Sequence, residues 1–452
     1  MRPSFSMADS HQFSSKVRAA LWYGLAILVV AVGSAAFAIG FRWLLLVSFK
    51  ATDGTSTVVE MMRALPWWGR LALPAAGGLL AGAIALLVDK ATRSQGVGDV
   101  MEAVAYGKGR LSMRTTLLKS LASWFAIASG GSIGREGPLI QFGGSLGSTV
   151  AKLFRIDESR ARALMAAGTA AGFAAAYNTP LAAILFVLEI VTGLVALEAI
   201  LTAVTATVIA TTITRAIIGG GPIYQQRVFS LVSSSELLAY AGLGVVGALV
   251  AQAFMRLLAT GEKALKRTAL PQPWRAGLGG ALVGAMAIVL PEVTGNGYEP
   301  LNAMLNGSVP ISLVAWLLIA KALSTTASVS SGSPGGVFTP TLLLGAATGM
   351  IFQWLLVWTF GSTAVGSAGA YALVGMAAAT AAMTHAPMMA AVLVFELSGD
   401  YAIVTPLLLA TAIATWLSRA LRADSLYGAE LRQRGVAWEV TLEGRRAVEV
   451  TR

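Results

Sequence analysis

Residues 322–395 contain no aspartate, glutamate, lysine or arginine, although a segment of this length can cross a lipid bilayer more than once. The chain of 452 residues has 56% hydrophobic and 12% charged residues, whereas a soluble domain carries about 25% charged residues. A membrane-spanning helix needs about 20 apolar residues. Charge-poor runs that approach or exceed this length also occupy residues 19–41, 71–88, 163–188, 237–255 and 276–291. The sequence therefore predicts an integral membrane protein with several spans.

The residue types that support catalysis are scarce in these apolar segments. The chain has no cysteine, and its two histidines are His11 and His385. Among acidic residues, we count only Glu136, Glu189 and Glu396 as intramembrane candidates. An enzyme would need a nucleophile with a base, or a metal cluster, and a cation transporter would need several intramembrane carboxylates. We therefore predict no enzyme activity, no metal and no cofactor, and keep a membrane-embedded hydrolase or transferase as the less favoured alternative.

The net charge of +11 comes largely from basic residues that lie beside the apolar runs. Positive residues collect on the cytoplasmic side of membrane spans, so this pattern predicts a topology rather than a nucleic-acid partner. Lys16 and Arg18 precede the first apolar run, and two later groups consist of Lys263, Lys266 and Arg267, and of Arg419, Arg422, Arg432 and Arg434. Both termini and the loop 263–275 are therefore predicted to be cytoplasmic.

Several apolar segments are too short for a full span or are interrupted by glycine and proline. Examples are residues 121–134, 137–151 and 337–349. Unsatisfied backbone groups are costly in lipid, so broken helices are tolerated where they are buried in protein or line an aqueous cavity. The pattern is typical of transporters and channels, in which interrupted helices surround an internal site.

Two short sequence motifs recur in the same order, and at nearly the same spacing, in the two halves of the chain. Residues 178–190 (NTPLAAILFVLEI) correspond to residues 385–397 (HAPMMAAVLVFEL), and the glycine-rich residues 131–138 correspond to residues 332–340. Chance recurrence of short apolar words is the alternative, which the shared order makes weaker. We therefore predict a repeat of about half the chain, with a binding site between the repeats.

Residues 129–140 (SGGSIGREGPLI) have the strongest chemical signal. Glycines let the backbone approach a ligand, and proline suits the first turn of a helix. The free N–H groups of a helix N-terminus bind anions without a full cation that would hold them too tightly. An intramembrane carboxylate is costly, so Glu136 is predicted to act as a tethered anion that leaves this site when protonated. A purely structural Arg135–Glu136 pair is the alternative.

These segments resemble motifs of the CLC family of chloride channels and chloride/proton antiporters, and the resemblance covers about residues 19–431. The family pattern G-[KR]-E-G-P is matched by residues 134–138, in which Glu136 takes the place of the gating glutamate. The pattern G-x-F-x-P is matched by residues 336–340, and the late tyrosine that coordinates the anion is matched by Tyr427. The resemblance implies chloride transport through a glutamate-gated pore.

The resemblance also implies the architecture. We expect an all-α polytopic membrane protein of two antiparallel (inverted) repeats of tilted and broken helices. The expected parts are a polar segment 1–15, a transmembrane domain 16–431 with halves of about 16–218 and 235–431, and a short cytoplasmic tail 432–452. The expected assembly is a homodimer with one pore per subunit, in the inner or plasma membrane of a prokaryote and without CBS domains.

Bound chloride ions are expected in place of a cofactor. The anion-binding residues that the resemblance implies are Gln95, Gly96, Val97, Arg135, Gly137, Val337, Phe338 and Tyr427. The family segment G-S-G-I-P corresponds to residues 94–98, in which Gln95 replaces the serine whose hydroxyl contacts the anion, and Gly98 replaces the proline. Selectivity among chloride, bromide, nitrate and fluoride is therefore left open, although Arg135 favours the chloride-type pattern over the fluoride exchangers.

A second departure concerns protons as a transported partner. Many exchangers of the family carry a second glutamate one residue after the position of Glu189, and here that residue is Ile190, which cannot hold a proton. Some exchangers of the family lack this glutamate. The sequence therefore leans slightly toward a chloride channel and keeps the chloride/proton antiporter as the alternative.

Overall fold

The structure is a computed structural model, and it describes residues 7–88, 96–106, 111–193, 197–221, 224, 231–434, 436–441 and 444–449. Nearly all of the described elements are helices. In chain order they are α1 (Met7–Asp53), α2 (Val58–Ala64), α3 (Trp67–Ala85), α4 (Gly96–Tyr106), α5 (Met113–Ala128), α6 (Glu136–Leu153), α7 (Glu158–Tyr177), α8 (Pro180–Phe186), η2 (Val187–Thr192), α9 (Leu197–Ile218), α10 (Glu236–Arg267), α11 (Gln272–Val289), η3 (Pro291–Val293), α12 (Tyr298–Leu305), α13 (Ile311–Ser330), α14 (Phe338–Phe360), α15 (Ala368–Thr384), α16 (Pro387–Ser398), α17 (Val404–Leu421) and α18 (Leu426–Gln433).

Seven helical segments of the described chain are long and apolar enough to cross a membrane. They are Lys16–Thr52, Trp67–Ala85, Ala199–Ile218, Glu236–Arg267, Ile311–Ser330, Phe338–Phe360 and Val404–Arg432. Shorter apolar helices lie between them, at Pro180–Thr192, Ala368–Thr384 and Pro387–Ser398. The prediction of an integral membrane protein with several spans and with interrupted helices is confirmed.

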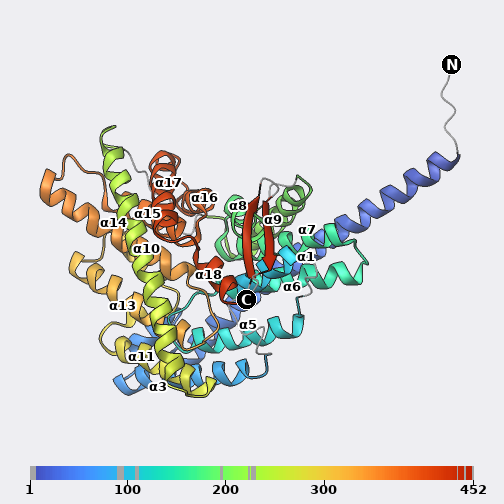
Figure 1. Ribbon diagram of the computed structural model, residues 1–452. Coiled ribbons are helices and arrows are strands. Elements are labelled where there is room, and N and C mark those ends of the chain that lie inside the picture. The colour runs from blue at the N-terminus through green and yellow to red at the C-terminus, as the bar shows by residue number, and fades with distance from the viewer. Residues whose placement is uncertain are drawn as a thin grey trace.

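The predicted all-α architecture is confirmed for the membrane-spanning part of the chain. After α18, strands β1 (Val436–Thr441) and β2 (Gly444–Glu449) form an antiparallel hairpin, which Figure 1 shows in red near the C-terminus. A short tail is predicted here from the sequence, and the hairpin is an addition to that prediction. Its signal is the alternation of larger apolar residues at Val436, Trp438 and Val440.

The two halves of the chain use the same helix crossings. In the first half, α6 crosses α7 so closely that a Cβ atom added at Gly143 would lie 1.9 Å from the carbonyl oxygen of Gly168. In the second half, a Cβ atom added at Gly345 of α14 would lie 2.4 Å from the carbonyl oxygen of Gly375 of α15. Small residues at such crossings let membrane helices approach backbone to backbone. The repeat therefore extends to the packing of the helices.

The halves also exchange helix caps. The carboxylate of Glu189 accepts hydrogen bonds from the Met388 and Met389 N–H groups at 3.3 and 2.7 Å, at the start of α16. The carboxylate of Glu396 accepts from the Leu181 and Ala182 N–H groups at 3.0 and 2.8 Å, at the start of α8. A carboxylate satisfies the free N–H groups of a helix start and its partial positive charge. Two of the three predicted intramembrane glutamates therefore join the halves.

Two predicted segments differ in extent from the helices that form. The segment 337–349 is expected to be short, but α14 continues unbroken to Phe360. Gly349 is tolerated inside this helix because it faces the backbone of Tyr371, where a Cβ atom would lie 1.9 Å from the carbonyl oxygen. Conversely, the charge-poor run 163–188 is not one helix, because Asn178 adopts a left-handed conformation (φ +59°) between α7 and α8.

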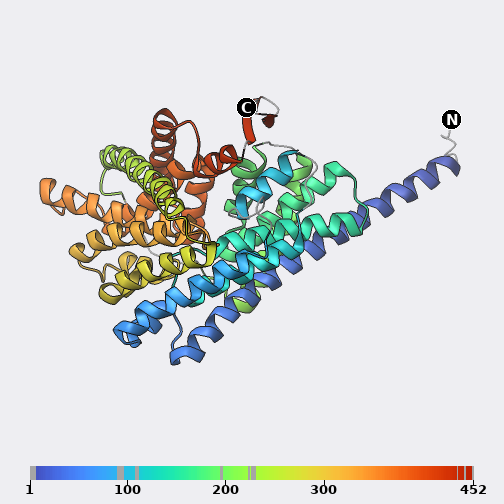
Figure 2. The same cartoon turned by 60° about the horizontal axis from the view of Figure 1, so that its bottom comes forward.

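Helices from the two halves lie side by side where α3 crosses α11. Figures 1 and 2 show α3 (blue) against α11 (yellow), and a Cβ atom added at Gly280 would lie 2.0 Å from the Pro74 carbonyl oxygen at this crossing. The N-terminal part of α1 projects away from the other helices (Figure 2). The segments that join interrupted helices meet in the interior and build the site described next.

Candidate functional site

Two glycine-rich loops, one from each half of the chain, pair inside the molecule. The Gly134 N–H donates to the Gly336 carbonyl at 2.7 Å, and the Gly336 N–H donates to the Gly134 carbonyl at 2.9 Å. The first loop leads into α6 and the second into α14. The bridge therefore brings together two helix N-termini, which carry free N–H groups and a partial positive charge.

The carboxylate of Glu136 occupies this junction. Glu136 is the first residue of α6 and is 2% exposed. One carboxylate oxygen accepts the Thr339 N–H at 3.1 Å, and the other accepts the Thr339 hydroxyl at 3.0 Å. The backbone N–H groups of Glu136 and Phe338 also interact favourably with the negative charge of the carboxylate. A negative group held by the N–H groups of two helix starts is in the arrangement that proteins use to bind anions.

Glycine is required beside this carboxylate because nothing larger fits. A Cβ atom added at Gly134 would lie 2.1 Å from both carboxylate oxygens of Glu136, and one added at Gly336 would lie 2.4 Å from Oε1. Gly137 differs from them, because its nearest neighbour would be the Gly336 nitrogen at 3.6 Å, an ordinary contact. The position of the carboxylate therefore depends on two of the motif glycines.

Thr339 is itself held by a tyrosine. The single hydroxyl proton of Thr339 is donated to Glu136, so the Tyr177 hydroxyl is the donor in its 2.7 Å hydrogen bond with the Thr339 hydroxyl oxygen. Neither side chain is predicted from the sequence as part of the site. Thr339 occupies the variable position of the G-x-F-x-P pattern, and Tyr177 lies 162 residues away from it with no local signal.

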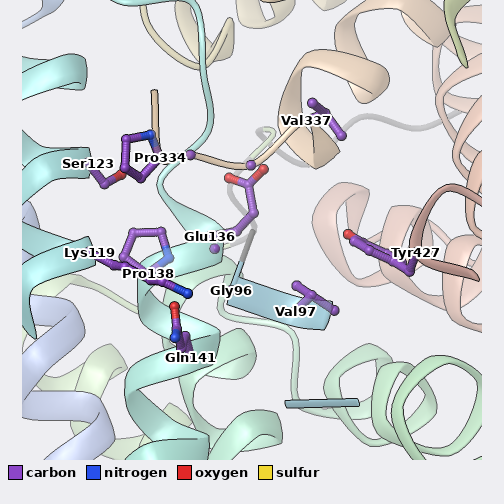
Figure 3. Close-up of a pocket in the computed structure, with 13 residues that line it drawn as sticks. Gly96, Val97, Lys119, Ser123, Glu136, Pro138, Gln141, Pro334, Val337 and Tyr427 are labelled. Carbon is purple, nitrogen blue, oxygen red and sulfur yellow. The ribbon is translucent and has the colours of Figure 1, made fainter. Parts of the chain in front are cut away.

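A small cavity of about 30 Å³ lies beside the carboxylate. This volume suits about one water-sized occupant. In Figure 3, Glu136 is central, the Tyr427 hydroxyl is directed toward it, and Val97 and Val337 lie on opposite sides. The lining residues are Gly96, Val97, Lys119, Ser123, Glu136, Gly137, Pro138, Gln141, Pro334, Gly335, Gly336, Val337 and Tyr427.

Most of the predicted site residues meet at this cavity. Those that line it are Gly96, Val97, Glu136, Gly137, Val337 and Tyr427. The backbone N–H of Phe338 interacts favourably with the negative charge of the Glu136 carboxylate, while the Phe338 ring packs against Phe173 and Tyr177. Gln95 lies outside the described residues. The anion-binding roles of all these residues stay predictions.

Arg135 lies on the other side of the carboxylate. It lines a second cavity of about 20 Å³ together with Glu136, Tyr177, Thr339 and others. Glu136 is the one residue that lines both this cavity and the first one. Among the described residues, the Glu136 side chain therefore stands between two spaces, which is the position that a gate must occupy.

Ser123 of α5 is a lining residue that the sequence does not predict. Its side-chain oxygen is buried and has no hydrogen-bond partner among the described residues. A buried hydroxyl without a hydrogen-bond partner costs free energy, unless a bound ligand provides that partner. The cavity therefore has an unused donor that an anion would satisfy.

A charged network lies beside the cavity, on α4 and α5. The Asp99 carboxylate forms a buried ion pair with Lys119, and it accepts from the Gln141 amide at 2.9 Å and from Arg434 Nη1 at 3.1 Å. Lys119 is predicted to have a structural role, with an approach to the anion path as the alternative. In the structure Lys119 is paired with Asp99 and also lines the cavity, so both roles stay predictions.

A larger vestibule of about 510 Å³ adjoins the small cavity, and Lys119, Pro334 and Val337 line both. Basic residues outnumber acidic ones in its lining, so its potential attracts anions. The charged lining residues are Lys119, Lys266, Arg275, Arg422 and Arg434, against Glu262 and Glu430. The two basic groups that are predicted to be cytoplasmic therefore contribute to one vestibule.

Ile190 is 1% exposed and belongs to the main hydrophobic core. It lies in the π-helix η2, directly after Glu189, whose carboxylate caps α16. The position at which many exchangers carry a proton-transferring glutamate is thus apolar and packed. This geometry agrees with the reading of Ile190 as a position without a proton carrier.

The family model of the voltage gated chloride channel matches residues 77–419 of this chain. The chain belongs to the voltage-gated chloride channel family. The resemblance to CLC proteins that the motifs indicate is thereby confirmed, and Glu136, Gly336 and Thr339 all lie within the matched range.

Two relatives of this chain are bacterial proteins. The chain is 40% identical over 378 residues to a putative ClcB-like chloride channel protein of Ralstonia nicotianae, covering 83% of this chain and 88% of the relative. It is 36% identical over 407 residues to the voltage-gated ClC-type chloride channel ClcB of Citrobacter koseri, covering 88% and 96%. Its fold is similar to that of a slow cyanobacterial Cl⁻/H⁺ antiporter, with a TM-score of 0.82, 23% identity, and coverage of 91% and 97%.

Proposed function

We propose that this protein transports chloride across the membrane through a pore that the Glu136 carboxylate gates. The observation that carries this proposal is the position of the carboxylate, which is bound at the starts of α6 and α14 and stands between two cavities. The similarity to bacterial proteins named as chloride channels supports chloride as the ion.

The gate works by competition between two anions. A protonated Glu136 has no charge for the helix N-termini to attract, so its side chain leaves and chloride takes the freed N–H groups. In the neighbouring cavity the Tyr427 hydroxyl and the buried Ser123 hydroxyl provide further donors. Because these donors are dipoles and not full cations, they bind chloride loosely enough to release it.

Proton coupling distinguishes a chloride channel from a chloride/proton antiporter. We propose conduction without stoichiometric proton exchange, because Ile190 replaces the proton-carrying glutamate and is packed in the core. The second candidate is a chloride/proton antiporter, and the similarity in fold to the slow cyanobacterial Cl⁻/H⁺ antiporter favours it. Arg135 before Glu136 favours chloride over fluoride in both forms.

Flux measurements in liposomes test the proposal. Purified protein is reconstituted in vesicles loaded with chloride, and chloride efflux and external pH are recorded together, with and without a potassium clamp. We expect chloride efflux without matching proton uptake, because no carboxylate stands at position 190. Proton movement driven against its gradient by chloride would establish the antiporter, and an absence of chloride flux would overturn the proposed function.

We also propose a homodimer with a transmembrane domain at 16–431, halves of about 16–218 and 235–431, a polar segment 1–15, and a cytoplasmic tail 432–452. Leu181 and Met388 support the dimer, because they lie in the first turns of the corresponding helices α8 and α16 and are 53% and 48% exposed. The basic vestibule supports a cytoplasmic C-terminus.

Single introduced cysteines test assembly and orientation together, because the chain has no native cysteine. We expect Met388→Cys to cross-link two copies in the membrane, and Arg432→Cys to react only with a reagent on the cytoplasmic side. A monomer under cross-linking conditions contradicts the dimer, and labelling of Arg432→Cys from outside contradicts the orientation.

A further inference from the structure

Gly98, in the first turn of α4, leaves a notch that a distant arginine fills. A Cβ atom added at Gly98 would lie 2.9 Å from Arg434 Nη2 and 3.1 Å from Glu430 Oε1. Any side chain at position 98 would therefore displace the guanidinium. Gly98 also stands where the CLC segment G-S-G-I-P has proline, so the arginine occupies the room that the missing ring leaves.

Arg434 ties α4 to α18. Its Nη1 donates to Asp99 at 3.1 Å and to Glu102 at 2.9 Å, both on α4, and its Nη2 donates to Glu430 on α18 at 2.8 Å. The Arg434 side chain is 15% exposed, so these bonds are largely shielded from water. Charge-assisted hydrogen bonds in a planar fork fix geometry as well as add energy.

The two helices that Arg434 joins both contribute to the small cavity. Gly96 and Val97 line it from the start of α4, and Tyr427 lines it from the first turn of α18. Arg434 itself is not among the residues that line the small cavity, so it acts on that site through its partners.

We propose that Arg434 is a positioning residue of the anion site, and that with Gly98 it replaces the proline of the family segment. Arg434 holds the start of α4 at a fixed distance from Tyr427. Its positive charge also compensates part of the negative charge of Asp99, Glu102 and Glu430 beside the proposed anion path. This inference rests on the proposed function, since it assigns a role in the same site. Without Arg434, the net negative charge of this group beside the path would increase by one, which disfavours a nearby anion.

Full-length variants test the inference by chloride titration calorimetry and by the chloride/nitrate flux ratio. We expect Arg434→Gln to weaken chloride binding by about tenfold, the loss found when groups that orient a ligand's contacts are removed from metal sites. Arg434→Lys should recover part of the affinity because it restores the charge. The matched control is Arg432→Gln, two residues earlier at the end of α18, since Arg432 is 62% exposed and pairs with Asp424.

A double-mutant cycle checks that Gly98 and Arg434 act as one unit. We expect Gly98→Ala to weaken chloride binding by displacing the guanidinium, and the double variant Gly98→Ala/Arg434→Gln to be no weaker than Arg434→Gln alone. Fully additive losses would overturn the shared role. The melting temperature is measured in parallel, and a lowered value with unchanged affinity would mean that Arg434 is only structural.

Tyr427→Phe separates this inference from the proposed function. Unchanged affinity and flux ratio in Arg434→Gln overturn the inference. If Tyr427→Phe binds chloride more weakly in that case, the proposed site stands without the role of Arg434. If both variants bind as the native protein does, the proposed anion site itself is overturned.

Discussion

Glu136→Gln is expected to make chloride flux independent of pH. The carboxylate is attracted to the starts of α6 and α14, where it accepts the Thr339 N–H and hydroxyl. A glutamine side chain is neutral at every pH, and its amide N–H₂ cannot accept a hydrogen bond, so it loses most of this attraction. The variant therefore resembles the protonated gate. Native flux should rise as pH falls, whereas flux through the variant should stay level between about pH 4 and pH 8.

The size of this effect follows from the hydrogen bonds that the gate loses. A hydrogen bond to a charged group contributes about 1.5–3 kcal/mol, and about 1.4 kcal/mol is a factor of ten in an equilibrium. Flux at neutral pH should therefore increase at least about tenfold. Liposome efflux assays over a pH series measure it. Steep pH control that persists in Glu136→Gln would show that another group is the gate.

Glu396→Gln provides a control at a second, partly buried glutamate. Its carboxylate caps the start of α8 through the Leu181 and Ala182 N–H groups, and it is not among the residues that line either small cavity. We expect this variant to lose stability, because two N–H groups lose a charged acceptor. Its flux should keep the native pH dependence. The comparison separates loss of a cap from loss of the gate.

The gate is predictable from the sequence because its parts are local. Glycines, Glu136 and a proline within a few residues predict a helix start that binds an anion, and Val337 and Phe338 belong to a second such start. The repeat words likewise predict that the two starts are related. The repeated segments do not predict that each glutamate caps a helix of the other half, because nothing near Glu189 in the sequence shows that its partner is α16.

The rest of the site depends on contacts between distant segments. Tyr177 orients Thr339 over 162 residues, and Arg434 reaches Asp99 over 335 residues. From the sequence, Arg434 is a basic residue near the C-terminus that predicts topology, and nothing in the sequence shows that it pairs with the buried carboxylate of Asp99. Gly98 is visible in the sequence as a departure from the family segment, but its meaning depends on the guanidinium that fills the notch.

Gly134→Ala is expected to open the gate by steric exclusion while leaving Glu136 chemically intact. The added methyl group would lie 2.1 Å from both carboxylate oxygens, closer than any stable contact allows. The backbone is not the obstacle, because Gly134 is not among the glycines with positive φ. The carboxylate must therefore leave its hydrogen bonds to Thr339. Flux at neutral pH should rise by about tenfold, as for Glu136→Gln, since the same bonds are lost.

Gly137→Ala is the control for this substitution, since it adds the same methyl group three residues away in the same motif. Its nearest neighbour would be the Gly336 nitrogen at 3.6 Å, so the carboxylate can stay in place and flux should remain pH-dependent. The double variant Gly134→Ala/Glu136→Gln should conduct no faster than Glu136→Gln alone, because both changes act by removing the same anion. If a folded Gly134→Ala protein keeps the native pH dependence, the backbone bridge between Gly134 and Gly336 must have moved while the carboxylate stayed in place. The carboxylate would then be held more firmly than its two hydrogen bonds to Thr339 explain.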